Sequence, residues 1–206
     1  RLGWSHGDQE IFDQEELIQL FDIKNVNKSA SSFNTEKLLW LNQQYIKAAD
    51  PYHLAHLLSP HLGRMGIDPA DGPDIVEVVK AQQERASTLV EMAQISEFVY
   101  RDFEQFDESA AKKHLRPVAR QPLEEMKKTL SELEQWEAEP LHDSVKRVAA
   151  DLNVNMGKVA QPLRVAVVGR AASPGIDVTL ELVGKEACLR RIDMALAFIT
   201  NREQQG

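Results

Sequence analysis

The apolar residues of this chain recur at helical spacing, and this periodicity narrows the possible folds more than any other feature. Leu123, Met126, Leu130 and Leu133 are three or four residues apart, so they share one face of a helix. No segment shows the alternation of apolar and polar residues that is typical of a half-buried strand. Prolines and glycines separate the periodic segments. We therefore expect an all-α fold of two successive small helical bundles behind a short leading segment.

Two turn-forming stretches indicate where the chain divides. Residues 63–73 form the densest cluster of glycine, proline and aspartate, and residues 103–107 separate two helical patterns. These stretches predict three parts. Residues 1–62 would form a leading segment with its connecting helices, and residues 63–105 and 106–206 would form two helical subdomains.

Charge and cysteine content limit the classes of protein to consider. The 206 residues carry a formal net charge of −8, which disfavours strong attraction to a phosphate backbone. That charge is uneven, because the part from residue 157 onward is +2 and the remainder is −10. Cys188 is the one cysteine, so an internal disulfide is excluded and a reducing, cytoplasmic location is expected. The chain starts at Arg1 instead of methionine, and we expect it to be a piece of a longer protein.

Residues 156–184 predict a helix, a turn and a second helix. The first helix is expected from Lys158 to Val168, with Pro162 tolerable only if it falls within the first turn. Gly169 can adopt the left-handed conformation that ends such a helix. Ser173 is then expected to cap the second helix.

Pro174 is expected as the first residue of that second helix. Arg164 would face the unpaired N–H groups where this helix starts. A guanidinium beside an electropositive helix end suits an anionic or hydrogen-bond-accepting ligand. The alternative is a buried helical hairpin whose arginine extends to solvent.

Short local motifs predict several helix starts. Asp13 with Glu16, and Thr88 with Glu91, have the spacing of capping boxes. Because the helix before Thr88 is expected to end near residue 84, Arg85 should lie at a joint between two helices.

The sequence gives little support for a metal site or a nucleotide-binding site. His53, His56 and His61 are close in sequence, but Pro60 is expected to break the helix between the last two, so no metal site is predicted. There is no phosphate-binding loop, dinucleotide fingerprint or nucleophile elbow. Residues 201–206 are expected to fray.

Several long blocks of the sequence carry a family resemblance. GKVAQPLRVAVVG, followed by SPG and GKEACLRRIDMAL, resembles the C-terminal signature of the anticodon-binding region of bacterial-type glutamyl-tRNA synthetases. RLGWSHGDQEIF and VNKSASSFNTEKLLWLN resemble the segment that follows the ATP-binding domain of these enzymes. Lys28 and Ser29 are not equated with the ATP-gripping loop of class I synthetases, because their surroundings match the segment beyond that loop.

The resemblance implies the tRNA-binding part of a class I glutamate–tRNA ligase. Residues 1–62 would then include the end of a tRNA stem-contact segment, and the two later subdomains would bind the anticodon. An N-terminal catalytic domain of the same enzyme would attach glutamate to tRNA(Glu), using ATP and Mg²⁺. The chain lacks the HIGH and KMSKS signatures, so it should be non-catalytic alone and need no cofactor of its own. It is expected to be a monomer that binds neither DNA nor membrane.

The resemblance also implies which residues contact the anticodon. The arginine of the E-R-A-S-T-L stretch, Arg85, would recognise the last base, and Arg164 with the turn after it would surround the first two. The expected anticodon residues are Arg85, Arg164, Ser173, Pro174, Ile176 and, more weakly, Gln161. Candidates for contact with the tRNA backbone are Lys28, Lys112, Lys113, Arg116 and Lys158.

Two other classes of function stay open at this point. A helical protein-interaction module with an acidic docking face would fit the −10 charge of the first part. A helix-turn-helix DNA-binding protein is disfavoured by the overall charge and by the lack of a basic recognition helix.

Overall fold

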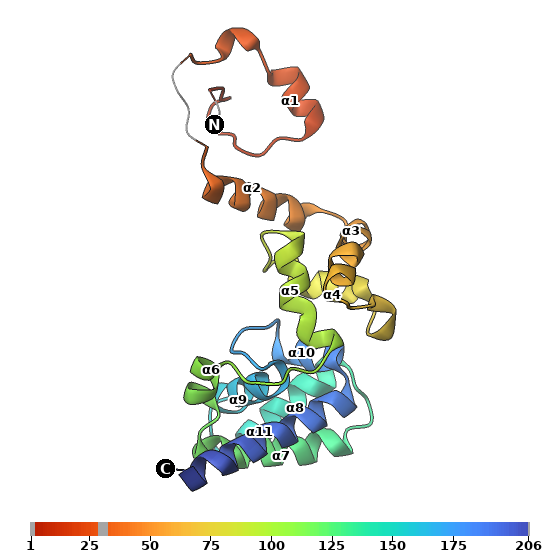
Figure 1. Cartoon of the computed structure of the whole chain (residues 1–206), viewed down its shortest axis with the longest axis vertical. Helices are drawn as coiled ribbons and strands as arrows, with labels where there is room; N and C mark the ends of the chain where they lie inside the picture. Colours follow the sequence, from red (N-terminus) through yellow and green to blue (C-terminus); the bar gives the residue numbers. More distant parts are fainter. Residues whose placement is uncertain (1–2, 29–32, 206) are drawn as a thin grey trace.

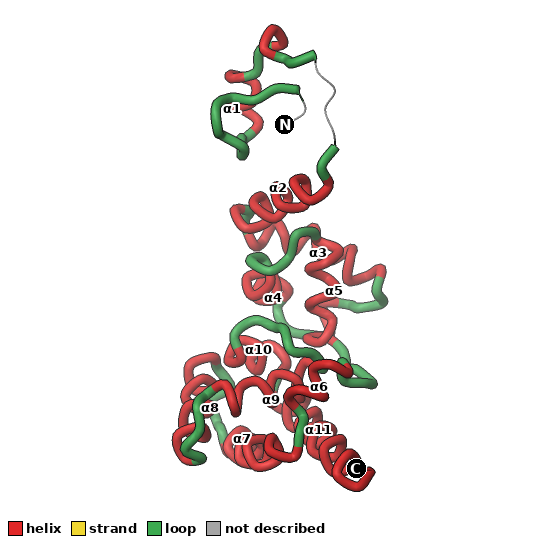
Figure 2. The backbone as a smooth tube through the Cα atoms, turned by 90° about the vertical axis from the view of Figure 1, so that its left-hand side faces the viewer, coloured by secondary structure: helices red, strands yellow, loops and turns green. Residues whose placement is uncertain are grey.

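A computed structural model of the protein describes residues 3–28 and 33–205. Within these ranges every regular element is an α-helix or a 3-10 turn and there is no strand, so the predicted all-α fold is confirmed (Figure 2). A leading segment, a first group of helices and a second group follow one another along the long axis of the molecule (Figure 1). The short 3-10 turns are Ile23–Asn25, Pro69–Asp71 and Pro117–Ala119.

The leading segment carries α1 (Gln14–Leu20) and contacts the rest of the molecule through α2. Asp13 Oδ1 accepts from the Glu16 backbone N–H at 2.7 Å, and Glu16 Oε2 accepts from the Asp13 N–H at 3.0 Å, which confirms this capping box. The hydroxyl of Tyr45 donates to the Phe12 carbonyl at 2.7 Å, which joins α2 to the leading segment.

The first bundle centres on the packing of α3 against α4 and α5. Its helices are α2 (Thr35–Ala48), α3 (Pro51–Arg64), α4 (Ile75–Gln82) and α5 (Leu89–Tyr100). Leu58, Leu62, Val79 and Met92 are fully buried between them. Burying such side chains stabilises the fold by about 1.5–3 kcal/mol each.

The second bundle surrounds α9. Its helices are α6 (Glu108–His114), α7 (Arg120–Glu132), α8 (Ala138–Asp151), α9 (Gly157–Val168), α10 (Ile176–Val183) and α11 (Lys185–Gln205). All of the other five contact α9, because its side chains are apolar on nearly every face. Val159, Leu163, Val165 and Val167 of α9 are fully buried.

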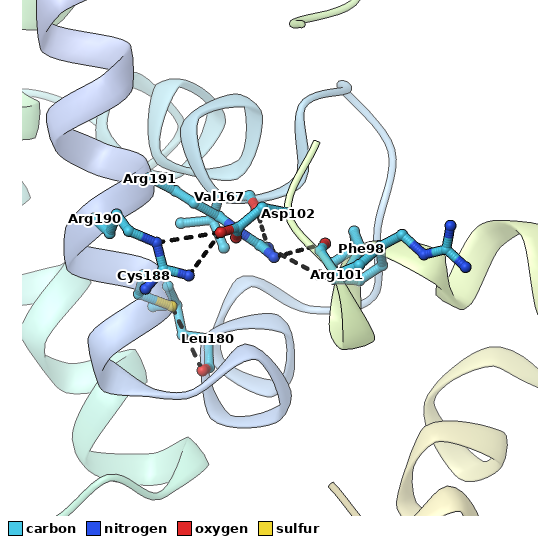
Figure 3. Close-up of polar contacts among 8 residues, drawn as sticks. All are labelled: Phe98, Arg101, Asp102, Val167, Leu180, Cys188, Arg190 and Arg191. Carbon is cyan, nitrogen blue, oxygen red and sulfur yellow. Dashed lines mark hydrogen bonds and ion pairs between the residues drawn. The ribbon is translucent and has the colours of Figure 1, made fainter. Parts of the chain in front are cut away.

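The two bundles share a packed joint. Val78 of α4 and Phe98 and Val99 of α5 belong to the core of the second bundle, although the rest of these helices packs in the first. Arg191 of α11 is 3% exposed and donates to the carbonyls of Phe98, Val167 and Arg101 at 2.8–2.9 Å (Figure 3). One buried guanidinium therefore joins the end of α5, the end of α9 and α11.

Two prolines lie inside helices, contrary to expectation. Pro60 was expected to break a helix, but α3 continues through it. Its ring is exposed, so the lost backbone hydrogen bond falls on the solvent side. Pro162 lies in the sixth position of α9 and not in its first turn, because α9 already begins at Gly157. Gly169 ends α9 with φ of 80°, as predicted.

The start of α10 also differs from the prediction. The capping position is Gly175, the first helical residue is Ile176, and no side chain caps the helix. Ser173 cannot serve as the cap because its hydroxyl lies 2.9 Å from the Thr179 hydroxyl and also contacts Arg164. Pro174 therefore lies in the turn and not in the helix.

The C-terminal tail does not fray over most of its length, because α11 runs to Gln205. Glu203 pairs with Arg120, and the Arg202 guanidinium lies 5.7 Å from the centre of the Phe198 ring. These contacts hold the last turns against the bundle. The expected division at residue 63 stays a prediction, and in this structure α3 shares one core with α4 and α5.

Candidate nucleic-acid interface

Arg85 lies in the turn between α4 and α5, at the helix joint that the sequence predicts. Its backbone N–H donates to the Gln82 carbonyl at 2.8 Å, which closes the turn. Its side chain is exposed, and its guanidinium makes no hydrogen bond or ion pair with any residue in the described ranges. Five N–H donors are therefore available to a ligand.

Arg164 projects from α9 towards the turn before α10. Its Nη1 donates to the Ser173 carbonyl at 3.0 Å and also contacts the Ser173 hydroxyl and the Pro174 carbonyl. The side chain is half-buried, and no acidic group in the described ranges forms an ion pair with it. Arg164 thus orders the turn with one edge of its guanidinium.

Arg170 is a third arginine at this place, and the sequence reasoning missed it. Its Nη2 donates to the carbonyls of Ile95 at 3.0 Å and Gln94 at 3.3 Å, on α5. Its guanidinium lies 5.9 Å from the centre of the Phe98 ring. The available signal was its position directly after Gly169, where a helix of the second bundle ends.

Arg85 and Arg170 line a small cleft between the two bundles, whereas Arg164 does not line it and contacts it only through Ser173. The cleft has a volume of about 200 Å³ and is lined by Gln82, Arg85, Glu91, Ile95, Arg170, Ala172 and Ser173. Burial lowers the pKa of Arg164, and the positive charge of Arg85 lowers this pKa further. Burial also lowers the pKa of Arg170, where Glu97 acts in the opposite direction and Arg85 acts in the same direction.

Arg164 and Arg170 stay protonated at neutral pH despite these shifts. Repulsion of Arg85 with Arg164 and Arg170 favours a ligand that brings acceptor atoms or negative charge into the cleft. The cleft is smaller than a typical drug-sized pocket and is suited to a single flat ring.

The other predicted anticodon residues are less accessible than expected. Ser173 is 8% exposed and Ile176 is 5% exposed, and Pro174 is also buried. Of these three, Ser173 lines the cleft. Gln161 is half-buried on α9 and is not among the residues that line it.

The predicted backbone contacts are all exposed, but the structure does not gather them around the cleft. Lys112 borders a different groove, between α6 and α11. Lys158 lies at the opposite end of α9 from Arg170, about 15 Å along the helix axis. Lys113 and Arg116 lie in and after α6, and Lys28 lies in the leading segment.

No group of three or more histidine, cysteine or acidic side chains is arranged to hold a metal ion within the described part of the chain. Among the same residues, no helix is both long and apolar enough to cross a bilayer.

Hydrogen-bond donors line this cleft, which lies where two helical bundles meet. Such an arrangement is suited to binding an exposed group that is rich in acceptor atoms. Residues 53–196 match the family described as "Anticodon binding domain". The match spans well over half of the chain, and the chain belongs to the anticodon binding domain family.

Its relatives narrow the assignment further. The chain is 56% identical over 202 residues to glutamate–tRNA ligase 1 of Nitrosococcus oceani, covering 98% of this chain and 43% of that protein. A crystal structure of a glutamate tRNA ligase from Elizabethkingia meningosepticum, in complex with its amino acid, superposes with a TM-score of 0.87 at 30% identity.

Glutamate–tRNA synthetase from Elizabethkingia anophelis gives a TM-score of 0.83, also at 30% identity. These two comparisons cover 96% and 95% of this chain, but 39% and 38% of the longer proteins. The chain therefore spans well under half the length of the ligases that it matches.

Proposed function

We propose that this chain binds the anticodon loop of tRNA(Glu) as part of a longer cytoplasmic glutamate–tRNA ligase. In that enzyme, an N-terminal catalytic domain outside this chain would bind ATP and Mg²⁺ and attach glutamate to the tRNA. The observation that carries this proposal is the unpaired Arg85 guanidinium, in a cleft between bundles that also holds Arg170 and Ser173.

The chemistry of the last anticodon base supports a role for Arg85. Anticodons for glutamate end in cytosine, whose pairing edge offers the O2 and N3 atoms as acceptors to a guanidinium. Anticodons for glutamine end in guanine, whose N1–H and N2–H groups would face the donors of Arg85. Each hydrogen bond left unmade in a buried site costs about 1–3 kcal/mol, so rejection of guanine would carry the specificity.

Arg164 and the turn from Ser173 to Ile176 would contact the first two bases. Single-stranded loop bases are splayed apart and recognised along their exposed edges. Arg164 already uses Nη1 for the turn carbonyls, so its remaining donors would serve the RNA. Pro174 and Ile176 are buried, so they would affect base recognition indirectly, by fixing the shape of the turn.

A titration with anticodon stem-loops tests the proposal. The chain should bind the tRNA(Glu) stem-loop more tightly than a scrambled loop, and the dependence on salt should be shallow because few phosphates are neutralised. Binding that is equal for both loops would contradict anticodon recognition. No RNA binding at all would favour the helical protein-interaction module instead.

A further inference from the structure

Two side chains that line the cleft between the bundles carry an acceptor oxygen that the arginines do not use. Glu91 Oε2 accepts from the Ser87 backbone N–H at 2.7 Å, whereas Oε1 accepts no hydrogen bond from the described residues. Gln82 is 1% exposed, and its buried Oε1 likewise has no donor among those residues. Both side chains line the cleft together with Arg85.

The orientation of the Gln82 amide follows from its neighbours. Its Nε2 donates to the Ile95 carbonyl at 3.2 Å, and this carbonyl also accepts from Arg170 at 3.0 Å. A flipped amide would place two oxygens against each other, so Oε1 has to face away from Ile95. This oxygen is fully buried, so a ligand in the cleft does not reach it, and the missing donor costs about 1–3 kcal/mol in the folded protein.

The position of Glu91 is unusual for a nucleic-acid site. A carboxylate repels phosphate groups, so it weakens contact with an RNA backbone. Carboxylates are instead suited to the edges of bases, where they accept hydrogen bonds from the amino group of cytosine. The cleft thus offers donors, from Arg85, and an acceptor, from Glu91.

We propose that Glu91 is a specificity-determining residue that accepts a hydrogen bond from the exocyclic amino group of the last anticodon base. This inference rests on the proposed function, in which Arg85 donates to O2 and N3 of the same cytosine. In place of the amino group, uracil carries a carbonyl oxygen, which would face the Glu91 carboxylate. Anticodons for lysine differ from those for glutamate in having uracil at this position.

Stem-loops with a modified last base test this inference without any mutation. Pyrimidin-2-one retains O2 and N3 of cytosine and lacks only the amino group. The 206-residue chain should bind a stem-loop with pyrimidin-2-one about tenfold more weakly than one with cytosine, through loss of a charge-assisted hydrogen bond. The uracil stem-loop should bind more weakly still.

The variant Glu91→Gln exchanges the acceptor for a donor. Its amide oxygen can still accept from Ser87, so the start of α5 is kept, and its NH₂ group then faces the cleft. Glu91→Gln should distinguish cytosine from pyrimidin-2-one by less than about twofold, and its preference for cytosine over uracil should narrow. The matched control is Glu97→Gln, which removes a charge from the same helix outside the cleft and should retain the tenfold difference.

The outcomes separate this inference from the proposed function. Equal binding of cytosine and pyrimidin-2-one by the unmodified chain overturns the role of Glu91, whereas a preference for the cytosine loop over a scrambled loop keeps anticodon binding. Failure to bind any stem-loop overturns both. If Glu91→Gln does not fold, as judged by circular dichroism, the comparison of the two bases on the unmodified chain still decides.

Discussion

Arg191 and Asp102 connect α11 to the segment that leaves α5, with Arg191 Nε donating to Asp102 Oδ1 at 2.8 Å (Figure 3). Arg190 donates to the other carboxylate oxygen of Asp102, at 2.8 Å from Nη2. The two arginines differ in burial, since the side chain of Arg191 is 4% exposed and that of Arg190 is 59% exposed. Neighbouring arginines on one aspartate therefore have different energetic roles.

The substitution Arg191→Met should destabilise the protein strongly. It leaves the carbonyls of Phe98 and Val167 buried without a donor, and we expect a loss of about 3 kcal/mol or more in the free energy of unfolding. Arg190→Met is the matched control, and an exposed ion pair contributes at most about 1 kcal/mol. Urea unfolding of both variants measures the difference, and equal losses would contradict the assignment.

The contacts of Asp102 that connect the two bundles should also weaken at low pH. Partial burial of Asp102 acts to raise its pKa, but hydrogen bonds from Arg191 and Arg190 outweigh this, so the pKa lies below its ordinary value. The unfolded chain therefore takes up this proton more readily than the folded one, and the stabilisation by ionised Asp102 is lost as the pH falls through the folded pKa.

The difference in urea midpoint between the natural chain and Asp102→Asn tests this prediction. It should be constant above about pH 5, where aspartate is ionised in both states, and it should shrink below about pH 4. A difference that stays unchanged down to pH 2.5 would show that ionised Asp102 does not stabilise the joint.

Replacing Arg85 with glutamine should reduce selectivity for the last anticodon base. The exposed side chain makes no hydrogen bond or ion pair with any described residue, so we expect a change in unfolding free energy within about 0.5 kcal/mol. The preference for a cytosine-ending over a guanine-ending stem-loop should narrow by about 1–3 kcal/mol. Unchanged selectivity in a matched binding assay would remove Arg85 from this role.

Replacing Arg164 with alanine should affect both binding and the turn before α10. Loss of its hydrogen bonds to the Ser173 and Pro174 carbonyls should cost about 1–3 kcal/mol in stability without unfolding the protein. Binding of the anticodon stem-loop should weaken at least about tenfold, measured beside circular dichroism. If helical content collapses together with binding, Arg164 is a structural residue only.

Local features of the fold could be predicted from the sequence, because they depend on contacts over a few residues. Asp13 caps α1 and Thr88 caps α5, as predicted. The second capping box differs in one detail, since Glu91 accepts from Ser87 and not from Thr88 itself. Arg85 at the joint of α4 and α5 was found in the same way, from the boundaries of two periodic segments.

Features that depend on distant contacts could not be predicted. The hydroxyl of Ser173 lies within hydrogen-bonding distance of Arg164 and Thr179, which overrides its preference for capping a helix. Arg170 and Arg191 bond to carbonyls that lie 75 and 93 residues away in the sequence. The position of Arg170 after Gly169 places it at a helix end but does not reveal these partners, no local pattern marks Arg191, and the resemblance to a family pointed to other residues.

The helix α5 contributes to both hydrophobic cores, with Met92 in the first and Phe98 in the second. Cutting the gene between the bundles would therefore leave each half-protein with an uncovered apolar face. Separately expressed halves should aggregate or fold only when produced together, and the intact chain should melt in calorimetry as one cooperative transition. Experiments that exchange domains between members of this family would then have to exchange both bundles together, as one unit.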